Sequence, residues 1–208
     1  MFTPNRKKQP VQKANKKSDK KTAIIEAALD LIAENGFQGA PTSKIADKAG
    51  VGVGSIYRYF KDKETLIHEI FNDLAEKINI EILKDFKPES PFREQYLRIS
   101  TNAFNYLVEN PKVLAFTEQY FNSPFGVQHR LSQMLGNNGI IRHENPLLII
   151  FESAIKERII KEFPQPVITA LTFGPIVFAV RDILNGLIEY TDEMVAKIVE
   201  ACWDAIKI

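Results

Sequence analysis

The sequence contains a single cysteine, Cys202, among its 208 residues. One thiol cannot form an intrachain disulfide, which excludes a small secreted scaffold held together by disulfides. Because no apolar stretch occurs before Ala23, we expect no signal peptide and a cytoplasmic protein. The longest uncharged window, residues 163–180, carries three prolines. It therefore predicts a buried helix and gives no support for a membrane partner.

A surplus of charge of one sign is also missing, since 27 basic and 26 acidic residues give a net charge of +1. The distribution is uneven. Residues 1–21 hold eight basic residues and one acidic residue, or +7, which leaves −6 for the rest. Residues 1–18 also lack apolar periodicity, so we predict a flexible basic arm before a mildly acidic body.

Strand patterns of any length are absent, and apolar residues recur at helical spacing, which predicts an all-α fold. We expect a first helix that Ser18 or Asp19 caps and that ends at Asn35-Gly36. Thr42 is the expected cap of a short second helix, and a third runs over about residues 53–60. Asp62 is the expected cap of a fourth helix that continues to about residue 83.

Prolines separate the helical patterns of the body. The last two helices are expected at about residues 165–185 and 191–206. Pro175 lies in the middle of the first of these and predicts a kink, because proline lacks an amide donor. Residues 122–145 are the least regular part of the body, and the sequence leaves their structure open.

Two short helices joined at Gly50 predict a helix-turn-helix, in which the second helix presents its outer face to DNA. If Ile56 points inward, 100° per residue places Arg58 outward, with Tyr57 and Tyr59 on its two flanks. An arginine with a phenol on each side suits the major groove, because the guanidinium fits guanine and the hydroxyls reach phosphates. The alternative is that both tyrosines are half-buried packing residues and Arg58 is merely solvated.

Further residues near the starts of these helices are candidates for contacts with phosphates or bases. The complete predicted DNA-binding set is Thr42, Ser43, Val53, Gly54, Ser55, Tyr57, Arg58, Tyr59 and Lys63.

Residues 44–67, KIADKAGVGVGSIYRYFKDKETLI, resemble the signature of the TetR family of bacterial transcription regulators. The preceding AIIEAALDLIAENGFQGAPTS is similar to the family's first helix. The resemblance covers about residues 23–74, while the end of the body resembles the family's last two helices. Gly52 departs from the pattern, since the family usually has a serine or threonine that caps the recognition helix, and this puts one hydroxyl contact to phosphate in doubt.

The resemblance implies an N-terminal three-helix, helix-turn-helix DNA-binding domain at 19–74 linked to a helical ligand-binding and dimerisation domain at 75–208. It also implies a homodimer on double-stranded, palindromic operator DNA, which a small-molecule effector releases. The apolar stripes of the last helix also favour dimerisation. Their candidate interface residues are Met194, Val195, Ile198, Val199 and Cys202. We expect Cys202 to be a buried apolar filler.

Aromatic side chains of the body favour a mainly apolar effector. The candidate pocket residues are Phe104, Phe116, Tyr120, Phe121, Phe151, Phe173 and Phe178. The histidines are dispersed, so no metal site and no cofactor is predicted, and no catalytic constellation is evident. The leading hypothesis is a ligand-responsive repressor and not an enzyme. The competing one is a helical small-molecule-binding protein or enzyme with a vestigial DNA-binding module.

Overall fold

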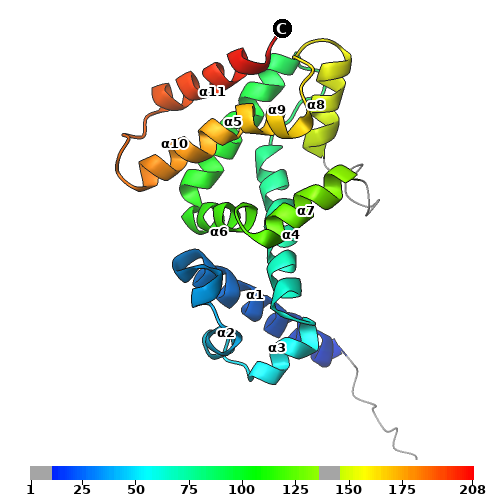
Figure 1. Ribbon diagram of the computed structural model, residues 1–208, viewed down its shortest axis with the longest axis vertical. Coiled ribbons are helices and arrows are strands. Elements are labelled where there is room, and N and C mark those ends of the chain that lie inside the picture. The colour runs from blue at the N-terminus through cyan, green and yellow to red at the C-terminus, as the bar shows by residue number, and fades with distance from the viewer. Residues whose placement is uncertain (1–10, 136–145) are drawn as a thin grey trace, which may run out of the picture. The chain divides into compact units, whose positions relative to one another are not determined.

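The computed structural model describes residues 11–135 and 146–208, and the regular elements in these ranges are all α-helices, which confirms the predicted class (Figure 1). The helices are α1 (Val11–Gly39), α2 (Thr42–Lys48), α3 (Val53–Tyr59), α4 (Lys63–Ile82), α5 (Phe92–Glu109), α6 (Pro111–Phe121), α7 (Pro124–Leu135), α8 (Pro146–Lys156), α9 (Gln165–Thr172), α10 (Gly174–Leu184) and α11 (Asp192–Ile206). The part of the predicted irregular segment at 136–145 lies outside the described residues.

The chain forms two compact units that divide within α4, between Ile70 and Phe71. We had placed this boundary after residue 74. In the first unit, α1, α2 and α3 pack against one another. Their buried apolar residues include Ile24, Ile32, Ile45, Ile56 and Phe60.

Helix α1 begins earlier than expected. It starts at Val11, so Ser18 and Asp19 lie inside the helix and do not cap it, and residues 11–18 are not an irregular arm. This stretch contains no proline and several good helix formers, which lets the helix extend beyond its apolar stripe. The other end follows the prediction, because Gly36 leaves the helical conformation at φ 71° and ψ 174°.

The predicted helix caps have different outcomes. Thr42 is the first residue of α2, and Pro41 occupies the cap position without a side-chain cap. Asp62 does cap α4, since its Oδ1 accepts hydrogen bonds from the backbone N and the Oγ1 of Thr65, both at 2.7 Å. These bonds, the backbone one foremost, hold the pKa of the Asp62 carboxyl below its usual value.

In the second unit, α5 packs against both α10 and α11, and α9 packs against α10 and α11. The core combines side chains from α5, α6, α8, α9, α10 and α11, and its largest members are Tyr96, Phe104, Phe151 and Trp203. An isolated antiparallel β-bridge joins Ile160 to Lys207, and neither residue belongs to a strand.

The predicted kink near Pro175 is a complete division of the helix. Helix α9 ends at Thr172, and α10 begins at Gly174 with Pro175 in its first turn. Proline is tolerated there because its missing N–H would have no partner in the first turn of a helix. Phe173 is the one residue between the two helices, and its backbone angles, φ −99° and ψ −23°, remain in the right-handed helical region. A single residue therefore connects α9 to α10.

Within the described ranges, Gln165–Leu184 is the one helical run long and apolar enough to cross a membrane by length and composition, and its apolar window is 22% buried in the single chain. The expected buried helix is therefore only partly buried. Ile168, Thr172, Ile176 and Val180 face the core. Phe178 faces outward with 58% of its side chain exposed.

The core contains two hydroxyl groups with incomplete hydrogen bonding. Tyr96 and Ser100 on α5 are 1% and 0% exposed, and neither hydroxyl oxygen has a partner in normal hydrogen-bond geometry among the described residues. Burial raises the pKa of Tyr96, which the neighbouring Ser100 hydroxyl partly opposes. The Ser100 hydroxyl and the Cys202 thiol interact with Tyr96 outside normal hydrogen-bond geometry, so its hydroxyl is poorly satisfied. A poorly satisfied buried hydroxyl is destabilising, so this site lowers the stability of the body.

Replacing Tyr96 with phenylalanine should leave the free energy of unfolding unchanged or raise it by about 1 kcal/mol, because the substitution removes a poorly satisfied hydroxyl and keeps the ring. Urea denaturation measures the change. Tyr190→Phe is the control, since the Tyr190 hydroxyl donates to Asn105 Oδ1 at 3.1 Å and its loss should lower stability slightly. A loss of more than about 1 kcal/mol in Tyr96→Phe would show that the hydroxyl is well satisfied.

Candidate nucleic-acid interface

A tight glycine turn joins α2 to α3. Gly50 adopts φ 65°, in the left-handed region that favours glycine. The turn is closed by hydrogen bonds from Gly50 N to Asp47 O at 3.2 Å and from Val51 N to Ala46 O at 3.0 Å. Since Ile56 and Phe60 are buried, the opposite side of α3 faces away from the three-helix core. This is the geometry that the sequence predicted for a recognition helix.

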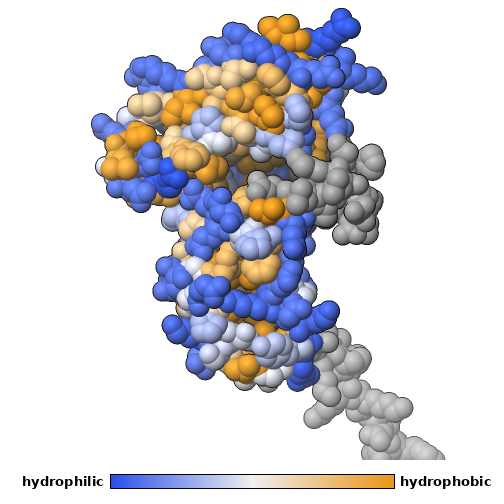
Figure 2. Space-filling view, viewed as in Figure 1, coloured by the Kyte–Doolittle hydropathy of each residue, from blue (hydrophilic) through white to orange (hydrophobic). Residues whose placement is uncertain are grey.

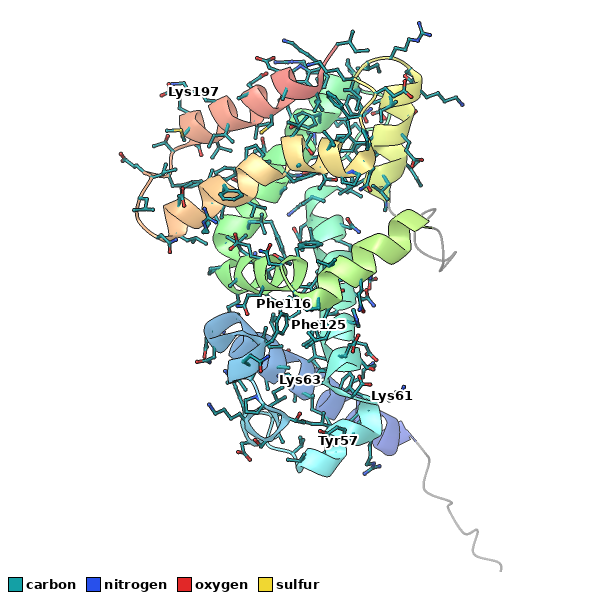
Figure 3. The ribbon with its side chains drawn as sticks, in the orientation of Figure 1. Tyr57, Lys61, Lys63, Phe116, Phe125 and Lys197 are labelled. Carbon is teal, nitrogen blue, oxygen red and sulfur yellow. The ribbon has the colours of Figure 1, made fainter. Side chains whose placement is uncertain are left out.

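The outer side of α3 carries predicted reader residues, of which Figure 3 labels Tyr57. Val53 and Tyr57 are 40% and 54% exposed, and Gly54 and Arg58 are exposed as well. Tyr59 is partly buried, with its ring centroid 6.4 Å from that of Phe60. The packing alternative therefore applies in part to Tyr59, which stays partly exposed, and does not describe Tyr57.

Two glycines of this region have no structural role in the fold. A Cβ atom added to Gly52 or Gly54 would have no atom within 4 Å, and neither residue has a positive φ. Glycine inside a helix costs about 1 kcal/mol relative to alanine. The fold would accept a side chain at Gly54, so its absence leaves α3 open to close approach by another molecule. Gly52 is the N-cap of α3 and provides no side-chain cap.

The remaining predicted contacts lie around this face with different exposures. Ser43 is exposed, and Thr42 and Ser55 are partly exposed. Lys63 is half-buried, and its Nζ donates a hydrogen bond to the carbonyl of Phe37 at the end of α1. Burial lowers the pKa of Lys63. Lys63 therefore joins α4 to α1, which leaves two of its three donors for a phosphate.

Two basic residues near the turn were missed at the sequence level. Lys44 in α2 and Lys61 after α3 are exposed and make no ion pair or hydrogen bond within the described part of the chain. Figure 3 labels Lys61 beside the start of α4. A search for basic residues that flank the recognition helix would have found both. By contrast, Lys48 pairs with Asp30 at 3.0 Å.

The predicted pocket aromatics do not form one site. A cavity of about 190 Å³ lies between α8 and α9, and only Phe151 and Phe173 of the predicted set line it. Phe116, Tyr120 and Phe121 belong to a different cluster on α6, in which the Tyr120 ring stacks on Phe71 with centroids 4.1 Å apart. Burial raises the pKa of Tyr120 to about 12.

The last two predicted pocket residues lie elsewhere. Phe104 is in the core and its ring stacks on Tyr190 with centroids 6.2 Å apart. Phe178 points outward and lies under the guanidinium of Arg181, 4.3 Å from its ring centroid. Arg181 also approaches Glu118 at 3.7 Å and Asp182 at 3.5 Å, so acidic side chains are its partners in the chain.

The predicted dimer residues of α11 divide between its two faces. Val195, Val199 and Cys202 are buried in the core of the single chain, so they are not available to a partner chain. Met194 is exposed and Ile198 is partly exposed. Burial raises the pKa of the Cys202 thiol, as expected for an apolar filler.

A different set of residues forms the exposed apolar surface of the second unit. We call it the α9–α11 face, and Figure 2 shows hydrophobic colouring over these helices. It comprises Val167, Ala170 and Phe178 from α9 and α10, and Met194, Ile198, Ala201 and Ala205 from α11. Exposed apolar side chains on neighbouring helices are a feature of interaction sites, although Ile198 and Ala205 are only partly exposed.

No group of three or more His, Cys, Asp or Glu residues suited to a metal ion occurs among the described residues. His143 lies outside them.

The glycine turn and the uncovered outer face of α3 define a DNA-binding protein of the helix-turn-helix class. Residues 24–70 match the family model of the bacterial regulatory proteins of the tetR family, and residues 91–207 match that of the tetracyclin repressor-like C-terminal domain. The chain belongs to the TetR family of transcription regulators, as its sequence resemblance implied.

Individual relatives agree with this assignment. An uncharacterized HTH-type transcriptional regulator from Haemophilus influenzae is 33% identical over 108 residues, which are 52% of this chain and 58% of that protein. The chain thus matches little more than half the length of its first curated relatives. A TetR family regulator from Marinobacter aquaeolei has a similar structure, with a TM-score of 0.77, 26% identity, and coverage of 93% and 98% of the two chains.

A second similar structure was solved with a ligand. It is the transcriptional regulator FadR from Bacillus subtilis in complex with stearoyl-CoA, with a TM-score of 0.66, 24% identity, and coverage of 87% of this chain and 96% of that one. At this identity the likeness establishes the shared fold.

Replacing Arg58 with alanine should reduce discrimination between operator and unrelated DNA, because a bidentate contact to guanine contributes about 1–3 kcal/mol per half-site. Tyr57→Phe should weaken binding to all sequences alike, since its hydroxyl is placed to reach a phosphate. Fluorescence anisotropy with both DNAs measures the two effects. Arg98→Ala, the same loss of charge at an exposed site on α5, is the control. Wild-type operator affinity in Arg58→Ala would refute the assignment.

Proposed function

We propose that this protein is a cytoplasmic, ligand-responsive repressor that binds a palindromic operator as a homodimer and is released by a small, mainly apolar effector. The observation that carries the proposal is the outer face of α3, where Tyr57 and Arg58 are exposed beside Gly54. The proposed base contact is Arg58, and Val53 offers its methyl groups to thymine. Thr42, Ser43, Ser55, Tyr57, Tyr59, Lys44, Lys61 and Lys63 are the proposed phosphate contacts.

The proposed dimer rests on the α9–α11 face. A palindromic operator has two identical half-sites, which a two-fold symmetric dimer matches. Phe178 is the largest exposed aromatic side chain of this face, and its contact with Arg181 holds it in place. Ala201 and Ala205 are small enough to let a helix of the partner approach closely.

The proposed switch depends on α4, which begins in the DNA-binding unit and continues into the second unit as one helix. A change at its second half is therefore transmitted along a continuous backbone to Lys63. Two half-sites lie about 34–36 Å apart, so a dimer must hold its two α3 helices at that separation. An effector that favours another separation by about 5.5 kcal/mol would shift the population from 1:99 to 99:1.

The effector is proposed to bind the cavity between α8 and α9, since its walls are mainly apolar. The complex of FadR with stearoyl-CoA shows that a protein of this fold accepts a ligand with an apolar chain.

The alternative function, a helical small-molecule-binding protein or enzyme with a vestigial DNA-binding module, is less well supported. A vestigial module has no reason to keep Gly54 in a helix, Arg58 exposed, and the turn at Gly50 intact. A mobility-shift assay with the DNA upstream of the protein's own gene separates the two functions. Retardation that excess unrelated DNA does not abolish supports the repressor, and its absence supports the alternative.

Replacing Phe178 with aspartate should convert a dimer into a monomer, because it removes the exposed ring and buries a carboxylate in the apolar interface, where desolvation outweighs pairing with Arg181 of the same chain. The variant should also lose operator binding, since one α3 helix contacts only one half-site. Sedimentation velocity and mobility shift measure the two effects. Ile80→Asp, which changes an exposed apolar residue of α4 outside the α9–α11 face, is the control. A dimeric Phe178→Asp variant would place the interface elsewhere.

An effector that releases DNA must itself bind less tightly when operator is present, because the coupling between two ligands is reciprocal. Apolar compounds that raise the melting temperature of the protein identify candidates. Calorimetric titration of each candidate with and without operator DNA then measures the coupling, which we expect to weaken effector binding about 5–150-fold. Equal affinities in both titrations would leave a DNA-binding protein whose pocket has no regulatory role.

A further inference from the structure

The cavity between α8 and α9 has an apolar interior and a polar rim. Leu147, Phe151 and Ile155 repeat every four residues along α8 and share one face. Ile168, Thr172 and Phe173 line the opposite wall from α9 and the residue after it. Phe151, Ile168 and Thr172 are buried, so they form the interior. Glu152, Gln165 and Thr169 are exposed and form the rim.

The rim carries one charged group. Glu152 is the single ionisable side chain among the residues that line the cavity, and α9 contributes no charged residue at all. Within the described part of the chain, the Glu152 carboxylate has no ion pair and no hydrogen bond. The mouth of the cavity therefore has a negative charge that no ion pair within residues 11–135 and 146–208 neutralises.

The neutral polar groups of the cavity offer free acceptors beside the Glu152 carboxylate. The Thr172 hydroxyl donates to Ile168 O at 2.8 Å, which leaves its oxygen lone pairs as the free function. Gln165 Nε2 donates to Thr169 Oγ1 at 3.4 Å, which leaves the Gln165 carbonyl oxygen free to accept. A ligand with several N–H donors matches such a site better than a carboxylate or phosphate does.

The size of the cavity limits the apolar part of the ligand. A cavity of about 150 Å³ binds benzene. The volume of about 190 Å³ here therefore suits an apolar group of about six to ten carbon atoms. An acyl chain as long as the stearoyl group of the FadR complex exceeds this volume.

We propose that this cavity binds a short-chain cationic amphiphile, with its apolar body between Phe151 and Phe173 and its ammonium group beside Glu152. This inference rests on the proposed function, for which it names the chemical class of the effector. The carboxylate selects the charge of the ligand at the rim, and the apolar walls select its size.

Three probes of similar size test the charge preference: 2-phenylethylamine, 2-phenylethanol and 3-phenylpropanoate. Isothermal titration of the full-length protein at pH 7 should give the tightest binding for the amine. It should exceed the alcohol about fivefold, as expected for an exposed ion pair. The carboxylate should bind most weakly. No binding at millimolar concentration, or equal or reversed affinities of amine and alcohol, would overturn the proposal.

Substitutions connect the preference to the residue. Glu152→Gln should make the affinities of the amine and the alcohol equal, while Glu157→Gln, the same change just after α8 and outside the cavity lining, should preserve the preference. Leu148→Trp should fill the cavity and weaken all three probes, with circular dichroism to verify the fold. If the amine keeps its preference in Glu152→Gln, the proposal is wrong.

Operator binding by the same preparations is measured separately by mobility shift. A protein that binds operator but none of the probes remains a DNA-binding regulator, and only the inference about its effector fails. If the protein binds the amine but no DNA, the assignment of the cavity stands and the proposed function is wrong.

Discussion

Ile56 and Phe60 are 2% and 1% exposed, and their burial fixes how α3 is rotated about its own axis. With 100° between successive residues, that rotation directs Arg58 away from the core and leaves Tyr57 beside it. The turn at Gly50 then fixes where α3 begins, and the contact from Lys63 to the Phe37 carbonyl ties α4 to the same core. The candidate DNA contacts therefore depend on apolar residues that never touch DNA.

Uncompensated groups in the structure lie where another molecule is expected. Gly54 gives up helix stability without any gain within the fold, Phe178 exposes an aromatic ring, and Glu152 has no partner at the mouth of a cavity. We propose DNA as the partner of the first, a second chain for the second and an effector for the third. The Tyr96 and Ser100 hydroxyls differ from these, because they are poorly satisfied deep in the core and face no proposed partner.

Much of the fold followed from the sequence because the relevant signals are local. Helical periodicity placed most of the helices, Gly36 and Gly50 marked the chain reversals, and Pro175 marked the division between α9 and α10. The predicted start of α1 was wrong. A polar segment of good helix formers can extend a helix, but it has no apolar stripe by which the sequence would show this. The outward position of Arg58 was correct, since one buried residue is sufficient to orient a short helix.

The sequence by itself determined the helical class, the family and the reader face of α3, since each depends on spacings between residues that lie near one another along the chain. Only the tertiary structure decided which aromatic side chains share a site. Phe151 and Phe173 line one cavity, while Phe104, Tyr120 and Phe178 lie in the core, in a separate cluster and on the outer surface. It likewise placed Val195, Val199 and Cys202 in the core. Apolar residues of one type satisfy all these environments equally well, so only the packing of distant helices distinguishes them.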